Sequence, residues 1–341
     1  MEQPYTIREQ LEQREHLILS PFATFSDRSK GRVKEETSCP MRTCFQRDRD
    51  RIIHSKAFRR LKHKTQVFLA PDGDHYRTRL THTLEVAQIA RTVARALSLN
   101  EDLTEAIALG HDLGHTPFGH AGERALAEIT GRPFRHNENS LRIVDVLEKR
   151  GKGLNLTAEV RDGILCHTGE RNASTPEGRL VRLSDRIAYI SHDIDDAIRG
   201  GVLSEWDIPA EYRSVLGVST SKRINFLVGD LIANSRPEGT EFLISLSPEA
   251  DKAMMGLRSF LFENVYTNPV AKGEERKAEV LLIQLYCYYE KNVDKLPNLY
   301  LERLASDELS VVLCDFIAGM SDRYAVELFK ELFTPKSWQV L

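Results

Sequence analysis

The stretch NEDLTEAIALGHDLG, residues 100–114, combines a helical pattern with a His-Asp pair near its end. An asparagine or aspartate near its start can cap a helix, because short polar side chains accept hydrogen bonds from the free backbone N–H groups there. Leu103, Ile107 and His111 recur every four residues and therefore share one face, and the final glycine can end the helix. The stretch predicts a helix whose inward face carries His111 at its end.

The same periodicity recurs along most of the chain. In RLTHTLEVAQIARTVARAL, residues 79–97, His82 continues an inward stripe of valine, isoleucine and leucine. In the helical pattern at 178–201, Asp185 lies at the edge of the buried face. Further helical patterns cover about 138–150 and 157–168. The sequence therefore predicts an all-α, mainly helical fold with at most a small β-hairpin, near EFLISL.

Three parts are expected along the chain. Residues 1–50 are polar and predict an irregular N-terminal arm, and residues 51–200 contain the helical core. Residues 201–341 predict a helical C-terminal region that packs on this core. Within the core, residues 51–64 contain six Lys or Arg and no acidic residue. This run predicts either a solvated helix face or a surface for anions or nucleic acid.

Composition limits the class of protein. A chain of 341 residues can bury a sizeable core without disulfides or structural metals. Its formal net charge of -3 argues against a wholly basic nucleic-acid binder. The five cysteines show no C-x-x-C pair, which favours reduced thiols. The first residues lack a secretory pattern, and no apolar run approaches the roughly 18 residues of a membrane span. We therefore expect a soluble, cytoplasmic protein with no membrane partner.

Histidines and acids gather in HDLGHTPFGHAGE, residues 111–123. A histidine on an apolar helix face is usually a core residue with its own hydrogen bonds. Here His82 and His111 both end inward stripes, and an aspartate follows His111 directly. Asp185 is an acid at a half-buried position, where a shared cation would compensate its charge. The last turn of a helix also favours positive charge, so these residues indicate a metal site.

The order H…HD…D resembles the HD phosphohydrolase superfamily at His82, His111, Asp112 and Asp185. Within it, HDLGHTPFGHAGE is similar to the deoxynucleoside triphosphate (dNTP) triphosphohydrolases, especially the shorter bacterial forms called deoxyguanosinetriphosphate triphosphohydrolase-like. Other similar segments are RIIHSKAFRRLKHKTQVF (51–68), RTRLTHTLEVAQIAR (77–91), RHNENSLRIV (135–144), RLSDRIAYISHDIDDAI (182–198) and FENVY (262–266). The resemblance thus covers about residues 40–270. It implies an HD-domain core and one divalent ion per subunit on the four residues. Two imidazoles suit Mn, Fe, Ni or Zn better than Mg.

The resemblance also implies a reaction, the hydrolysis of dGTP and other dNTPs at the α-phosphate to a deoxynucleoside and inorganic tripolyphosphate. His120 would exchange a proton with the 5′ oxygen or the attacking water, and Glu123 would orient its ring. His115 and His136 would contact phosphate. The implied substrate contacts are Arg79 on phosphate, and Gln66, Tyr189 and Asp193 on the nucleoside. His167 and His192 are expected to be core residues or to lie behind the ligands.

Two other interpretations stay open. A nucleotidase or phosphodiesterase on the same scaffold would release a monophosphate. A nucleic-acid-binding, nucleotide-sensing module would use residues 51–64 as a surface for single strands. The residues do not distinguish adenine from guanine. The resemblance further implies a homo-oligomer, hexameric or tetrameric, and residues 1–60 could help build a site for a regulatory nucleotide.

Overall fold

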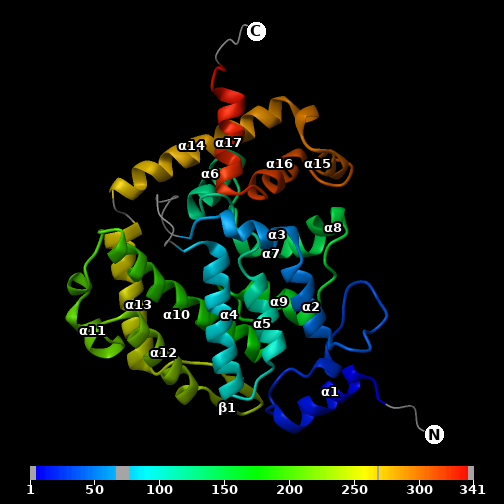
Figure 1. Ribbon diagram of the computed structural model, residues 1–341, viewed down its shortest axis with the longest axis vertical. Helices are drawn as coiled ribbons and strands as arrows, with labels where there is room; N and C mark the ends of the chain where they lie inside the picture. The colour runs from blue at the N-terminus through cyan, green and yellow to red at the C-terminus, as the bar shows by residue number, and fades with distance from the viewer. Residues whose placement is uncertain (1–4, 67–76, 267–268, 337–341) are drawn as a thin grey trace.

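The computed structural model describes residues 5–66, 77–266 and 269–336 (Figure 1). These ranges are mainly helical and contain one two-stranded sheet, in which β1 (Arg236–Glu238) pairs antiparallel with β2 (Glu241–Leu243). The predicted all-α fold with a small hairpin near EFLISL is confirmed.

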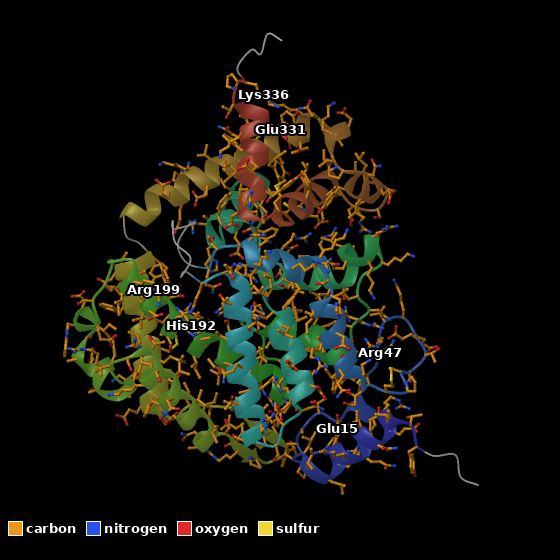
Figure 2. All side chains as sticks on the ribbon, in the orientation of Figure 1. Glu15, Arg47, His192, Arg199, Glu331 and Lys336 are labelled. Carbon is orange, nitrogen blue, oxygen red and sulfur yellow. The ribbon has the colours of Figure 1, made fainter. Side chains whose placement is uncertain are left out.

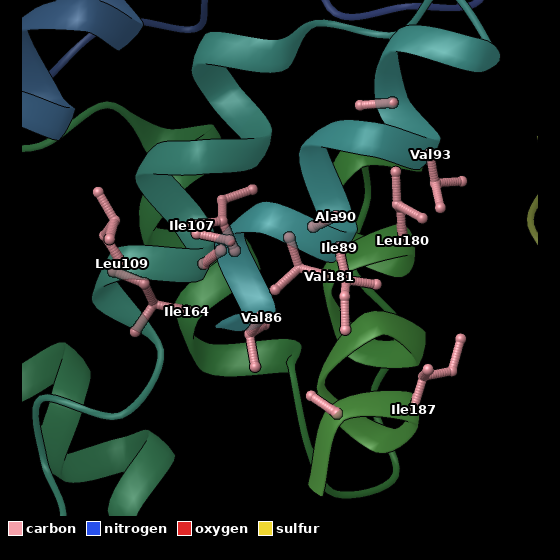
Figure 3. Close-up of a cluster of buried hydrophobic side chains, with 14 of the residues drawn as sticks. Val86, Ile89, Ala90, Val93, Ile107, Leu109, Ile164, Leu180, Val181 and Ile187 are labelled. Atoms are coloured by element: carbon pink, nitrogen blue, oxygen red, sulfur yellow. The ribbon is translucent and has the colours of Figure 1, made fainter. Parts of the chain in front are cut away.

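The main hydrophobic core lies between α2 (Cys44–Ile53), α4 (Arg79–Ala96), α5 (Glu101–Gly110), α9 (Ala158–Cys166) and α10 (Pro176–Arg199). The side chains of Thr78, Asn100 and Thr175 accept hydrogen bonds from the first turns of α4, α5 and α10, as expected for helix caps. Apolar side chains from α4, α5, α9 and α10 meet in this core (Figure 3). Ile107 and Val181 are completely buried within it. These packed helices fix the relative positions of the side chains that they carry.

Another group of helices packs on one flank of α10 (Figure 1). It consists of the 3₁₀ turn η4 (Glu205–Asp207), α11 (Ala210–Leu216), α12 (Thr220–Asn234), α13 (Pro248–Leu261) and the π-helical turn η5 (Phe262–Tyr266). Leu227 and Met254 are buried and join the main core. This flank therefore shares its hydrophobic core with α10.

The last helices form a separate layer across one end of the bundle (Figure 1). This C-terminal layer contains α14 (Pro269–Lys291), the 3₁₀ turn η6 (Val293–Lys295), α15 (Asn298–Arg303), α16 (Leu309–Ala318) and α17 (Asp322–Phe333). It has its own buried cluster, in which Leu285 and Leu313 meet Leu126 of α6 (His120–Thr130). Figure 2 places Glu331 of this layer and Glu15 near opposite ends of the molecule. Because α6 follows the HDLGHTPFG segment directly, it joins that segment to the layer.

Short helices surround the ends of the core helices. They are α3 (Lys56–Arg60), the 3₁₀ turn η2 (Leu61–His63), α7 (His136–Arg142), the π-helical turn η3 (Ile143–Leu147) and α8 (Glu148–Gly151). The helix predicted over about 138–150 is present as α7 and the π-helical turn η3, which follow one another directly, but it ends at Leu147. Lys149 and Arg150 have φ values of +50° and +58°, a left-handed backbone that ends the helical path.

The N-terminal region is more ordered than the sequence predicted. Residues 1–50 were expected to be irregular, but they include α1 (Ile7–Ile18), the 3₁₀ turn η1 (Ser26–Arg28) and the first turns of α2. A capping box begins α1, where Thr6 and Glu9 exchange side-chain and backbone hydrogen bonds. Such local polar contacts stabilise a helix that carries few apolar residues.

Two further expectations concern the chain as a whole. All five cysteines are free, as their spacing predicted. Among the described residues, no helix combines the length and apolar character that crossing a membrane requires. The part boundaries after residues 50 and 200 stay predictions.

Candidate metal centre

The four predicted ligands come together where the start of α4, the end of α5 and the middle of α10 meet. His82 lies in the first turn of α4, His111 and Asp112 follow α5 directly, and Asp185 lies in α10. Oδ1 of Asp185 is 3.1 Å from Nε2 of His82 and 3.7 Å from Nε2 of His111. Nε2 of His111 is 3.4 Å from Oδ1 of Asp112. Ligands about 2.1 Å from one ion lie roughly 3.0 to 3.4 Å apart in octahedral or tetrahedral geometry. The 3.1 and 3.4 Å separations fit a single ion, and the 3.7 Å separation is slightly longer. His82, His111 and Asp112 have ligand atoms close enough together to share one ion.

The ring of His111 is held in the form that a metal ligand requires. Its Nδ1 lies 2.6 Å from the carbonyl oxygen of Ala108, which can only accept a hydrogen bond. Nδ1 therefore carries the hydrogen, and Nε2 presents a lone pair. This Nε2 is buried and has no hydrogen-bond partner among the described residues. A buried lone pair that faces two carboxylates is a strong indication of a cation site.

The charges around the four residues also suit a cation. Burial alone would raise the pKa of Asp112, but the positive charge around it, which includes the Arg79 guanidinium, lowers it well below its usual value. Nη1 of Arg79 donates a 2.9 Å hydrogen bond to this carboxylate. Burial likewise opposes ionisation of Asp185, whose pKa is nevertheless lowered, with the hydrogen bond from His82 as the main cause. Two ionised carboxylates thus face the same point.

Glu123 joins a second group of histidines beside the first. Its Oε2 lies 2.8 Å from Nδ1 of His120, and its Oε1 lies 2.7 Å from Nδ1 of His136. Burial would raise the pKa of Glu123, but these two hydrogen bonds lower it far below its usual range. His120 begins α6, and 69% of its side chain is exposed. Glu123 is therefore an ionised acceptor that orients one exposed and one buried imidazole.

His115 connects the two groups. Its Nε2 lies 3.1 Å from Oδ1 of Asp112, and its ring stacks on that of His136 with centroids 3.9 Å apart. The candidate metal site and the His120–Glu123 pair are thus parts of one continuous site. His115, His120 and His136 were predicted from the resemblance, and the structure brings all three together.

His167 belongs to this site, although the sequence predicted only a core or supporting residue. Its Nε2 lies 3.2 Å from Nε2 of His136, and its Nδ1 lies 2.7 Å from the carbonyl oxygen of Ile164. Burial lowers the pKa of His167 to about 3, so this ring is neutral and accepts. Burial also opposes the charged form of His136, but Glu123 raises its pKa, so His136 can donate from both nitrogens. His167 and His111 each follow the last residue of a helix, and each ring donates a hydrogen bond to the carbonyl oxygen three residues earlier. This shared position after a helix is the sequence signal that could have indicated His167 as a site residue.

The predicted nucleoside contacts lie around this centre. Tyr189 is one turn after Asp185 on α10 and is half-buried, and burial raises its pKa to about 12. Asp193, one turn further, is buried and accepts a hydrogen bond from the hydroxyl of Tyr266. Burial raises the pKa of Asp193 to about 7. Tyr266 was not predicted individually, although its segment FENVY was.

Gln66 and His192 lie at the edges. Gln66 lies beside the loop that contains Gly119, because the carbonyl oxygen of Gln66 would be 3.9 Å from a Cβ added at this glycine. Its side-chain Oε1 is buried and has no partner among the described residues. His192, labelled in Figure 2, lies on α10 with Nδ1 3.2 Å from Oε2 of Glu85, and burial lowers its pKa to about 3. The ring of His192 lies edge-on to that of His82, with centroids 6.4 Å apart, so it is a buried neighbour of a predicted ligand.

Comparison with known families agrees with this architecture. The HD domain model matches residues 79–190, and the phosphohydrolase-associated domain model matches residues 244–331. The first range contains all four candidate ligands, and the second contains most of the C-terminal layer. The bundle is therefore an HD domain, and the protein is an HD-domain hydrolase.

Full-length relatives define the family. Deoxyguanosinetriphosphate triphosphohydrolase-like proteins from Caldanaerobacter subterraneus subsp. tengcongensis and Desulfatibacillum aliphaticivorans are 56% and 52% identical, over 97% of this chain and 97% and 99% of their own. One from Clostridium perfringens is 50% identical over 97% of this chain and 98% of its own. This chain belongs to the family of deoxyguanosinetriphosphate triphosphohydrolase-like proteins, which confirms the resemblance. A solved structure of a hypothetical protein from Aquifex aeolicus aligns with 85% of this chain and 68% of its own, with 22% identity and a TM-score of 0.48.

Proposed function

We propose that this protein hydrolyses dNTPs at the α-phosphate and releases a deoxynucleoside and inorganic tripolyphosphate. The unpartnered Nε2 of His111 carries the proposal, because it faces two ionised carboxylates beside an oriented histidine pair. The names of the relatives, which are dGTP triphosphohydrolase-like, support the substrate class.

One divalent ion would be held by His82, His111, Asp112 and Asp185. Their nitrogen and oxygen donors favour Mn, Fe, Ni or Zn over Mg. Bound there, such an ion supplies Lewis-acid chemistry, which activates water and polarises a phosphoryl oxygen. The carbonyl of Ala108 and the guanidinium of Arg79 keep two of the ligands oriented toward it.

We assign proton transfer to His120. Glu123 occupies its Nδ1, so Nε2 on the exposed side of the ring is free to exchange a proton with the 5′ oxygen or the attacking water. His136 lies between Glu123 and His167, and the carboxylate of Glu123 raises its pKa, which favours contact with an anionic phosphate. His115 and Arg79 add contacts on the metal side of the same phosphate chain.

The nucleoside would lie along α10. We propose that Tyr189 contacts the sugar edge, where a 2′-hydroxyl would clash, and that Asp193 lies near the 3′-hydroxyl. Gln66 would contact the nucleoside from the opposite side, with its unpartnered Oε1 available as an acceptor. The buried Asp193–Tyr266 hydrogen bond would hold the aspartate in place.

Product identification tests the proposal. Metal-free protein is reconstituted with Mn²⁺ and incubated with each dNTP, singly and as a mixture, and the products are separated by anion-exchange chromatography. Tripolyphosphate with deoxynucleoside is the expected result, and Asp112→Ala is the inactive control. Release of a monophosphate would instead identify a nucleotidase or phosphodiesterase. Hydrolysis only in mixtures would indicate a regulatory nucleotide site.

Three further properties stay predictions. They are the assembly into a homo-oligomer, the binding of single-stranded nucleic acid to residues 51–64, and the dNTP that is preferred.

A further inference from the structure

One carboxylate of the C-terminal layer contacts two segments of the candidate site. Asp322, in the first turn of α17, is only 6% exposed. Its Oδ1 accepts a 3.0 Å hydrogen bond from the backbone N–H of Phe118. Its Oδ2 accepts from the backbone N–H of Thr65 at 2.9 Å and from the Thr65 hydroxyl at 2.7 Å. Phe118 precedes His120 by two residues, and Thr65 precedes Gln66 directly.

The backbone that Asp322 holds is strained. Phe118 and Gly119 have φ values of +60° and +56°, and a bulky side chain rarely adopts a positive φ. Such a conformation persists only when its surroundings enforce it. Here the hydrogen bond to Asp322 is reinforced by the Phe118 ring, which packs against the buried cluster of the C-terminal layer. The direction in which the chain enters α6, and hence the position of His120, depends on this turn.

A second polar contact joins the same two parts of the molecule. The ammonium group of Lys64 is buried and donates to the carbonyl oxygens of His115 and Ala318. Ala318 is the last residue of α16, so this lysine bridges the layer and the histidine segment. The segment 115–119 is thus held by the layer at both ends.

We propose that Asp322 is a positioning residue of the HD site, which acts on His120 through Phe118 and on Gln66 through Thr65. On this view the C-terminal layer completes the reaction site, although it contributes none of the proposed metal ligands. The effect on turnover rests on the proposed function, whereas the effect on the 115–119 segment rests on the contacts alone.

A matched pair of variants separates positioning from general stability. Asp322→Asn keeps the shape of the side chain, but its amide nitrogen must face either the Phe118 N–H or the donors of Thr65. Asp315→Asn is the control. Asp315 is a buried carboxylate of the same layer that accepts hydrogen bonds from Arg142 of α7 at 2.7 and 2.6 Å. Within the part of the chain that the structure describes, its side chain makes no hydrogen bond or ion pair with residues 115–119.

Three measurements on the full chain decide the matter. Hydrogen exchange is followed by mass spectrometry in peptides that cover residues 114–124, Mn²⁺ affinity is measured by calorimetry, and kcat and KM are measured with dNTP. For Asp322→Asn we expect faster exchange in these peptides and unchanged Mn²⁺ affinity. We expect a kcat lower by about tenfold or more, since a displacement of about 1 Å can cost about a hundredfold. KM should change much less. Asp315→Asn should lose stability but retain wild-type exchange in 114–124 and a kcat within about twofold.

Equal exchange and equal kcat in the two variants would overturn the proposal. If Asp322→Asn does not fold, Thr65→Val removes one hydrogen bond to Asp322 and should give smaller changes of the same sign. Wild-type exchange and wild-type kcat in Thr65→Val would then overturn the proposal. If the wild-type protein hydrolyses no dNTP, the proposed function fails, but the exchange comparison still tests whether Asp322 holds the segment.

Discussion

Different residues of the site are assigned to metal binding and to proton transfer, and two substitutions should separate these roles. Asp112→Ala should abolish both Mn²⁺ binding and turnover, because it removes a ligand and leaves Arg79 without its acceptor. His120→Ala should retain Mn²⁺ but lower kcat by about 10²- to 10⁴-fold, the usual contribution of a general acid or base. Bound metal is measured by elemental analysis of dialysed protein. Full turnover in either variant would contradict the assignment.

Lys64 makes a prediction about pH. Burial lowers the pKa of Lys64 to about 7, whereas an unfolded lysine titrates near about 10.4. Between these pH values the unfolded chain holds a proton on Lys64 that the folded chain lacks. The free energy of unfolding therefore rises with pH, by up to about 1.4 kcal/mol per pH unit. Below pH 7 both states are protonated, and burial of the charge costs most.

The measurement is urea unfolding between pH 6.5 and 10. We expect Lys64→Met to remove this rise from the free energy of unfolding, while Lys62→Met, at an exposed lysine two residues earlier, leaves it intact. Parallel pH profiles for wild-type protein and Lys64→Met would show that Lys64 keeps its proton in the folded state.

At the level of helices, apolar periodicity predicted the elements whose formation depends on local sequence. The helices that carry His82, precede His111 and carry Asp185 follow from apolar spacing and caps. Their periodicity correctly placed His82 and His111 in the interior and Asp185 at the edge of the buried face. The break at Lys149 and Arg150 has no such signal, because nothing in their side chains requires a left-handed backbone. α6 was also not anticipated, although its buried residues Ala121, Ala125 and Leu126 recur at helical spacing.

The site residues likewise divide into those that local sequence indicated and those that depend on tertiary contacts. Ligand spacing and the resemblance predicted most of its residues, but Lys64, Asp322 and Tyr266 act through contacts between distant parts of the chain. Asp322 lies 204 positions from Phe118, and Tyr266 lies 73 positions from Asp193. Pairings over such separations depend on tertiary packing, which one sequence does not reveal.

Gly114 shows how one helix contact controls the site. The sequence indicated a helix stop, but a Cβ at Gly114 would lie 2.1 Å from the backbone nitrogen of Ser140 and 2.3 Å from the carbonyl oxygen of His136. Gly114→Ala should therefore push α7 away and lower the free energy of unfolding by about 1–3 kcal/mol or more. Gly229 lies on the exposed face of α12, where an added Cβ would have no atom of the described residues within 4 Å. Gly229→Ala should therefore raise the free energy of unfolding by about 0.5–1 kcal/mol. Thermal unfolding measures both, and a stable Gly114→Ala would refute the close approach.

For the whole molecule, the metal should also be a structural component. Its proposed ligands come from α4, α10 and the end of α5, so binding would join helices of the main core. Mn²⁺ at a hundredfold excess over Kd should stabilise the folded state by about 2.7 kcal/mol. We expect a higher Tm in Mn²⁺ than in EDTA for wild-type protein and no difference for Asp185→Ala. An equal rise in that variant would place the stabilising ion elsewhere.

The uneven burial of the site has a practical consequence. His82, His111, His115 and His167 are almost completely enclosed, whereas most of the His120 ring is open to solvent. An imidazole-acylating reagent such as diethyl pyrocarbonate should therefore modify His120 long before its neighbours in the folded protein. Peptide mapping over a time course would follow this, and a deoxynucleotide seated in the site should slow it. A covalent label could thus report occupancy even under conditions in which no turnover takes place.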